Sequence, residues 1–213
     1  MVLFKLKNVK YKNIIKYPDL EIKAGITTFI MGESGVGKST LLKLLNGVLT
    51  PTDGNVWLVD EKVLNIDSIE LRRKVLLVGQ SAFLFDEQSI RENFRMFFNY
   101  RDEILPCDDE IKAFLAICSI EMSLDGCVYE LSGGEKQRVF IAIHLALGFE
   151  VLMMDEPTSA LDEKNGFSLL ANIKSYCKEN KKSLIIISHN REAVEHFADD
   201  IIVLGDEGKC QKF

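Results

Sequence analysis

The hydrophobic pattern of this chain changes along its length. Near the N-terminus, residues 4–7 and 20–23 alternate between apolar and polar side chains, which is typical of strands with one exposed face. Residues 75–78, 151–154 and 184–187 are instead continuous apolar runs, as expected of strands that are buried on both faces. The pattern therefore predicts a β-rich N-terminal flank followed by a parallel sheet.

Helical periodicity accompanies these strands. Residues 163–178 lie between two of the buried runs, which gives the strand, helix, strand order of a parallel sheet. The segment from about residue 89 to residue 147 is mostly helical in its pattern, and Asp108 and Asp109 can cap one of its helices. We therefore expect an α/β fold in which a helical lobe is inserted into the sheet domain.

A glycine-rich turn follows the apolar residues 26–31, and an amphipathic helix follows the turn. The turn matches the P-loop spacing G-x-x-x-x-G-K-[ST]. Glycines let successive backbone N–H groups face one anion, and the Lys38 ammonium adds a positive charge at the outer phosphates. The predicted ligand is a nucleoside triphosphate with Mg²⁺. The candidate residues are Gly32, Glu33, Ser34, Gly35, Val36, Gly37, Lys38, Ser39 and Thr40.

Composition and charge narrow the possible partners. The chain has 213 residues, of which 47% are hydrophobic, so it can form one domain with a sizeable core or two small lobes. Its net charge is −6 and its pI is near 5.2. An acidic chain is poorly suited to hold a nucleic-acid backbone by charge, so no nucleic-acid partner is expected.

Cysteine usage and hydropathy indicate a compartment. The five cysteines form no C-x-x-C pair, which favours reduced cytosolic thiols over a disulfide framework or a zinc site. No apolar stretch reaches the roughly 18–20 residues that span a bilayer. We therefore expect a cytoplasmic protein, and any membrane-spanning part of its system would be another chain or subunit.

Polar side chains follow three of the buried runs. Asp155 and Glu156 come where open α/β sheets bind their ligands; Asp155 suits Mg²⁺ binding through water, and Glu156 suits the role of a base toward an attacking water. His189 could bridge a γ-phosphate to this carboxylate, and Gln80 could ligate Mg²⁺ or orient water. The alternative for each of these side chains is a purely structural role.

A second small-residue turn occupies residues 131–138, which read Leu-Ser-Gly-Gly-Glu-Lys-Gln-Arg. It opens a long helix and so offers a second helix N-terminus to a phosphate. The candidate residues are Ser132, Gly133, Gly134 and Glu135. One nucleotide does not need two such turns in one chain, so we interpret this turn as one that contacts the nucleotide bound by a second copy.

With these motifs in this order, the chain resembles the ATP-binding subunit of an ABC transporter. Residues 131–138 are similar to the signature of that family, residues 32–39 to its Walker A motif, residues 151–156 to its Walker B motif and residues 159–162 to its D-loop. Gln80 and His189 are similar to its Q-loop and switch residues. Ile143 and His144 depart from the alanine-arginine pair that is common after the signature.

The resemblance implies a P-loop NTPase with a RecA-like parallel sheet core. It also implies a single ABC ATPase domain over residues 1–213. The nucleotide-binding core with its β flank would comprise residues 1–88 and 149–213, and a helical subdomain carrying the signature would span about residues 89–148.

The resemblance further implies ATP hydrolysis in a homodimer that holds two Mg-ATP between its chains. The implied catalytic residues are Lys38, Gln80, Glu156 and His189, and the implied magnesium ligands are Ser39, Gln80 and Asp155. Glu156 would act as general base and His189 as γ-phosphate sensor. The signature residues would complete the site of the opposite chain. Tyr11 stands where the family has an aromatic that stacks on adenine, and Tyr17 is close enough to compete for this role.

A membrane-spanning permease is the implied partner, docked near residues 80–85. Phe83 and Phe85 are notably apolar for a loop, as a docking surface requires; the alternative is that they attach the helical lobe to the core. The protein would then be peripheral on the inner face of the cell membrane. The sequences of residues 84–90, 132–138 and 159–165 are similar to those of short bacterial subunits linked to iron or metal export. Lipoprotein-release and division-related subunits are the alternatives.

Two other functions compete with transport. Non-transport ABC-type ATPases that act on DNA or on soluble assemblies share the signature, but carry long coiled-coil segments that the stretch between Gln80 and Leu131 is too short to contain. A nucleotide-binding regulator without turnover is the second alternative. It is disfavoured by the presence of Glu156 and His189.

Overall fold

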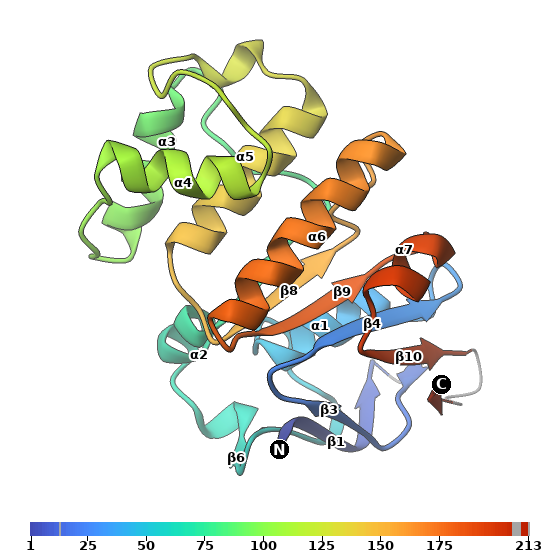
Figure 1. The fold of residues 1–213 in the computed structure, drawn as a ribbon. Coiled ribbons are helices and arrows are strands. Elements are labelled where there is room, and N and C mark those ends of the chain that lie inside the picture. Colours follow the sequence, from blue (N-terminus) through green and yellow to red (C-terminus); the bar gives the residue numbers. More distant parts are fainter. Residues whose placement is uncertain (13, 206–209, 213) are drawn as a thin grey trace. The chain divides into compact units, whose positions relative to one another are not determined.

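The computed structural model describes residues 1–12, 14–205 and 210–212 (Figure 1). The chain divides into two units. The first contains Met1–Leu77, Phe149–Glu156 and Cys177–Phe213, and the second contains Val78–Gly148 and Pro157–Tyr176. The helical subdomain predicted at about residues 89–148 falls within the second unit.

The N-terminal flank of the first unit forms an antiparallel sheet. Its strands are β1 (Val2–Tyr11), β2 (Ile15–Lys16), β3 (Leu20–Lys23), β5 (Asp53–Leu58) and β6 (Glu61–Lys62). Strand β1 pairs with β2, β3 and β5, and β5 pairs with β6. Phe4 and Leu6 of β1 are buried whereas Lys7 is exposed, so the alternation in the sequence corresponds to a sheet with one buried face.

The second sheet is the one that carries the nucleotide-binding motifs. Its order is β11 (Cys210–Lys212), β10 (Asp200–Leu204), β4 (Thr27–Gly32), β9 (Ser183–Ile187), β8 (Val151–Asp155) and β7 (Val75–Val78). Strands β10, β4, β9 and β8 are parallel neighbours, and β11 is antiparallel to β10. Every residue of β9 is buried, as the continuous apolar run predicts.

Helix α1 (Lys38–Leu45) packs between the two sheets of the first unit (Figure 1). Leu41, Leu42, Leu44 and Leu45 are completely buried and belong to one hydrophobic cluster with side chains of β1 and β9. Burial of each leucine contributes about 1.5–3 kcal/mol. Because α1 begins at Lys38, this packing fixes the glycine-rich turn that precedes it. Helices α2 (Ser68–Lys74) and α7 (Arg191–Phe197) and the 3₁₀ turn η1 (Val63–Asn65) complete the unit.

The second unit is mainly helical. It contains α3 (Ile90–Tyr100), α4 (Asp108–Ile117), the 3₁₀ turn η2 (Val128–Glu130), α5 (Gly133–Ala146) and the first part of α6 (Glu163–Glu179). Ile90, Phe94 and Phe98 form the buried face of α3, at the spacing of a helical stripe. No helix of the described residues is long and apolar enough to span a bilayer.

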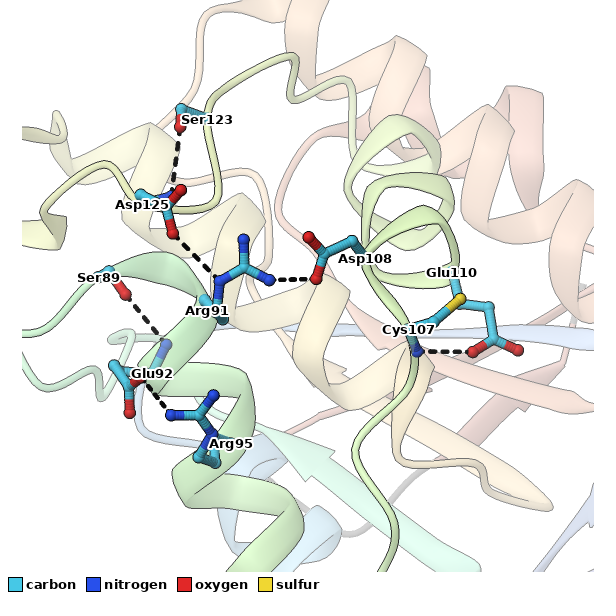
Figure 2. Close-up of polar contacts among 9 residues, drawn as sticks. All are labelled: Ser89, Arg91, Glu92, Arg95, Cys107, Asp108, Glu110, Ser123 and Asp125. Atoms are coloured by element: carbon cyan, nitrogen blue, oxygen red, sulfur yellow. Dashed lines mark hydrogen bonds and ion pairs between the residues drawn. The ribbon is translucent and has the colours of Figure 1, made fainter.

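Arg91 joins three segments of this unit (Figure 2). Its Nε donates to Asp125 Oδ1 at 3.1 Å, and its Nη1 contacts Asp108 Oδ1 at the start of α4. The pKa of Asp108 lies below its usual value, chiefly because of the hydrogen bond from Arg91. Helix α4 is capped by Cys107, whose N–H donates to Glu110 Oε2 at 2.8 Å. The predicted capping by Asp108 and Asp109 is therefore wrong, because both carboxylates lie inside the first turn.

His144 is a buried polar side chain of α5. Its Nδ1 lies 2.8 Å from the Phe140 carbonyl oxygen, and the rings of Phe97 and Phe140 have centroids 6.0 and 4.4 Å from that of the imidazole. Burial lowers the pKa of His144 to about 4, and the charge of Arg101 acts in the same direction. His144 is therefore neutral in the folded chain at neutral pH.

We expect the free energy of unfolding to decrease as the pH falls from about 6.5 to about 4. In that range the unfolded chain binds a proton at His144 and the folded chain does not, so acid removes up to about 3 kcal/mol of stability. Urea unfolding of His144→Gln at several pH values should lack this part of the slope. His196→Gln, at an exposed position, is the matched control. An unchanged slope in His144→Gln would contradict the prediction.

Candidate functional site

Strand β4 brings the glycine-rich turn to the carboxyl end of the parallel sheet. Gly32 lies so close to β10 that a Cβ atom would be 2.4 Å from the Leu204 carbonyl oxygen. Gly37 has a φ of 100°, and a Cβ atom there would be 2.9 Å from the Tyr17 hydroxyl. Both positions therefore require glycine, one for a close backbone approach and one for a left-handed conformation.

Tyr17 supports the turn from the hydrophobic core. Only 2% of its surface is exposed, and its hydroxyl donates to the Gly37 carbonyl oxygen at 2.8 Å. Burial raises the pKa of Tyr17, so the phenol remains a donor. Tyr11 is partly exposed on β1, with Lys12 Nζ 5.4 Å from its ring centroid. Because Tyr17 is buried in the core and Tyr11 is partly exposed, we propose that Tyr11 stacks on the adenine base.

Lys38 is a buried cation surrounded by acceptors. Its Nζ donates to the carbonyl oxygens of Gly32 at 2.9 Å and Glu33 at 2.8 Å. Burial lowers the pKa of Lys38, and the charges of Glu156 and Asp155 oppose this effect. The carboxylates therefore act electrostatically on the lysine, and one positive and two negative groups belong to the same edge of the sheet.

Neighbouring parallel strands bring Glu156 and His189 together. Asp155 ends β8 opposite Ile187 of β9, and the Glu156 N–H donates to the Ile187 carbonyl oxygen at 3.0 Å. His189 Nε2 lies 3.0 Å from Glu156 Oε1. Glu156 has a φ of 51°, a left-handed conformation that costs about 1–3 kcal/mol at a non-glycine residue and is typical of functional sites.

The residues of this edge fit a triphosphate with Mg²⁺. Among the described residues no side chain caps α1 at Gly37, so the N–H groups of its first turn can donate hydrogen bonds to a bound anion. The described residues also contain no group of three or more His, Cys, Asp or Glu side chains that could hold a metal ion. Mg²⁺ is commonly held by one or two carboxylates together with phosphate oxygens and water, which Asp155 and a bound triphosphate can supply.

The second unit contains the other predicted site residues. Ser132 caps α5: the Ser132 N–H and hydroxyl donate to Glu135 Oε2 at 2.8 and 2.7 Å, and the Glu135 N–H donates to Ser132 Oγ at 3.3 Å. A Cβ atom on Gly134 would be 2.9 Å from the Ala160 carbonyl oxygen, so the signature turn and the predicted D-loop touch. Gly133 and Gln80 are exposed.

Two supporting contacts are absent from the sequence-based prediction. The first is the hydrogen bond between Tyr17 and Gly37, because nothing in the spacing of the chain relates these two residues. The sequence indicates Tyr17 only as an alternative to Tyr11 for stacking on the base. The second is the contact of Gln137 Nε2 with the Gly79 carbonyl oxygen at 3.3 Å. The only feature of the sequence that could have indicated this contact is the position of Gln137 inside the signature.

The parallel sheet, with a P-loop at the carboxyl end of one strand, defines the class of protein. It is a P-loop nucleotide-binding domain. Within this class, the family described as ABC transporter matches residues 15–159. The chain belongs to this family. The predicted fold class and the family resemblance are thereby confirmed.

Solved structures agree with this placement. One, described as the dimeric structure of a bacterial ABC transporter cassette, is 30% identical with a TM-score of 0.85, over 99% of this chain and 98% of that one. Another, described as a post-hydrolysis state of an ATP-binding cassette bound to ADP and Pi, gives the same values. These descriptions support the predicted ATPase class.

Curated relatives carry transport names. The methionine import ATP-binding protein of Clostridium tetani (strain Massachusetts / E88) is 32% identical over 90% of this chain and 61% of its own length. The thiamine import ATP-binding protein of Haemophilus influenzae (strain 86-028NP) is 34% identical over 91% of both chains. The chain thus spans 61% of the methionine relative, and less of others.

We expect Tyr17→Phe to weaken ATP binding. The variant keeps the buried ring but loses the hydrogen bond to Gly37, which is worth about 0.5–1.5 kcal/mol and corresponds to a Kd for MgATP raised about 2–10-fold. Titration calorimetry would measure the change. Tyr129→Phe, at an exposed tyrosine of the second unit, should bind as the unmodified chain does. Equal affinities of Tyr17→Phe and that control would refute the support role.

Proposed function

We propose that this chain, as one ABC ATPase domain, is the ATP-hydrolysing subunit of an ABC transporter. The observation that carries the proposal is the juxtaposition of His189 Nε2 and Glu156 Oε1 at 3.0 Å. These residues follow β9, which neighbours the P-loop strand β4, and β8, which is the next strand beyond β9. A carboxylate oriented by an imidazole is suited to accept a proton from an attacking water. The family match supports the same reading.

Each candidate site residue of the first unit has a distinct proposed role. The P-loop amides and Lys38 bind and orient the phosphates, Ser39 and Asp155 hold Mg²⁺, and Glu156 accepts the proton of the water. Mg²⁺, when bound, neutralises charge that develops on the phosphates during in-line attack. His189 orients the Glu156 carboxylate and contacts the γ-phosphate. Gln80 of the second unit is proposed as a further magnesium ligand.

The second half of each ATP site is proposed to come from another copy. Ser132, Gly133, Gly134 and Glu135 lie at the N-terminus of a helix of fourteen residues, which is suited to face a phosphate. Two chains would then hold two Mg-ATP between them. The dimeric cassettes to which the chain is similar support this arrangement.

A membrane-spanning permease is the proposed partner, with the chain on the cytoplasmic face of the membrane. Phe83 is 66% exposed, and its ring centroid lies 5.6 Å from that of Phe85, which is also exposed. An exposed aromatic pair on a loop is suited to a protein partner. The transport names of the relatives support a transporter over an ATPase acting on DNA or soluble assemblies.

The cargo is proposed only as a solute selected by the permease. The relatives are named for import of methionine and thiamine, whereas the sequences of residues 84–90, 132–138 and 159–165 are similar to those of metal exporters. Metal-ion export therefore stays a prediction. Uptake or efflux assays with iron and with methionine, in cells lacking this chain, would test it.

Glu156→Gln should abolish turnover and preserve binding. Without the general base, the ATPase rate should fall about 10²–10⁴-fold, and an ATP-bound dimer should accumulate on size-exclusion chromatography with MgATP. Glu195→Gln, an exposed change on α7, should hydrolyse ATP normally. Unimpaired hydrolysis by Glu156→Gln would sink the assigned mechanism.

Phe83→Ser should reduce recovery of the permease. Removing an exposed aromatic from a docking surface lowers affinity without opening the core, so the tagged variant should co-purify with less membrane protein. Ile69→Ser removes an apolar side chain of nearly equal exposure, 65%, from α2 and should recover the normal amount. If both variants recover it equally, the docking surface lies elsewhere.

A further inference from the structure

Residues 79–86 connect β7 to the turn before α3 and form neither helix nor strand. We refer to them as the connecting segment. Under the proposed function, this segment carries a magnesium ligand, Gln80, and the docking pair Phe83 and Phe85. Whatever fixes the connecting segment therefore influences both the nucleotide site and the partner surface.

Helix α5 holds both ends of the connecting segment through two consecutive side chains. Gln137 is buried and donates from Nε2 to the Gly79 carbonyl oxygen at 3.3 Å. Lys136 Nζ lies 2.8 Å from Asp86 Oδ1. An unmade hydrogen bond of a buried amide is costly, so the contact of Gln137 holds Gly79 in place. Lys136 adds a charge-assisted contact at the opposite end.

Helix α3 and the turn η2 secure the same end of the segment. The amide of Asn93 is buried; its Oδ1 accepts from the Phe85 N–H at 2.8 Å and its Nδ2 donates to the Phe85 carbonyl oxygen at 3.1 Å. The Tyr129 N–H donates to the Asp86 carbonyl oxygen at 2.9 Å. Residues 80–84 are thus the part between two anchored ends.

Helix α5 begins in the signature turn, residues 131–138. Ser132 caps α5, and Lys136 and Gln137 follow within its first turns. A helix is a stiff element because each residue is tied to its neighbours by backbone hydrogen bonds. A displacement of the N-terminus of α5 therefore acts on Gly79 and Asp86 through these two side chains.

We propose that Lys136 and Gln137 are positioning residues that couple occupation of the signature turn to the placement of the connecting segment. This inference rests on the proposed function, because the occupant of the turn is the Mg-ATP bound by a second copy. Once the start of α5 is held by that nucleotide, the two contacts restrict residues 79–86. The Gln80 amide and the docking pair then become ordered together.

Hydrogen–deuterium exchange of residues 79–86 tests the proposal in the full chain carrying Glu156→Gln, with and without MgATP. MgATP should slow exchange in this segment. Lys136→Glu and Asp86→Lys should each reduce that protection about twofold to fivefold, the range expected for a partly exposed ion pair. The double variant Lys136→Glu/Asp86→Lys should restore it, because the reversed charges can pair again.

Two further variants complete the experiment. Lys74→Glu reverses one charge of the exposed pair with Glu70, 2.6 Å apart on α2 of the first unit, and should leave the protection of residues 79–86 unchanged. Gln137→Glu keeps the shape of the side chain, loses the N–H donor, and should reduce the protection as the single reversals do.

The outcomes separate the two proposals. If MgATP produces no dimer of the Glu156→Gln chain, the proposed function fails and the coupling fails with it. If the dimer forms but the single reversals retain full protection, or if the double variant remains as unprotected as the single ones, the coupling alone is wrong.

Discussion

The rest of the site depends on the hydrogen bonds that the buried ammonium of Lys38 donates to the P-loop. A buried charge requires close partners, and here they are two carbonyl oxygens of the P-loop, with Glu156 and Asp155 acting at longer range. The carbonyl groups can point at the lysine only because the loop is curled, which its glycines permit. The lysine thus holds the loop in the shape that also presents its N–H groups outward.

Sheet topology explains why distant residues meet around this cation. The P-loop strand β4 lies between β10 and β9, and β9 pairs with β8. Parallel strands end at the same edge, so side chains that follow β4, β8 and β9 gather there although they are far apart in sequence. Tyr17 and the leucines of α1 are buried in one hydrophobic cluster, and this packing holds the P-loop at the edge.

Periodicity and motif spacing predicted strands such as β7, β8 and β9 and helices such as α1 and α6, because burial on one or both faces leaves a direct pattern in the sequence. They did not predict the two-residue strands β2 and β6 or the short helices α2 and α7. They failed at the cap of α4, where Cys107 and Glu110 replace Asp108, since several adjacent polar residues satisfy the same rule. They also could not find contacts between residues such as Tyr17 and Gly37, because these depend on how sheets and helices pack. The roles of the site residues are inferred from their chemistry, their positions at strand ends and the resemblance, and they stay proposals.

The two helix N-termini of the predicted ATP site differ in how they are capped. At Gly37 the described residues supply no side-chain cap to α1, so an external anion is the natural partner for its N–H groups. At Ser132 the cap is internal, and the Ser132 hydroxyl already donates to Glu135. That hydrogen bond contributes to the lowered pKa of Glu135, which keeps a negative charge beside the turn.

A phosphate can therefore enter the P-loop without displacing a side chain, whereas at the signature turn it must compete with Glu135 for the Ser132 hydroxyl. Binding to one chain would then precede the joining of two.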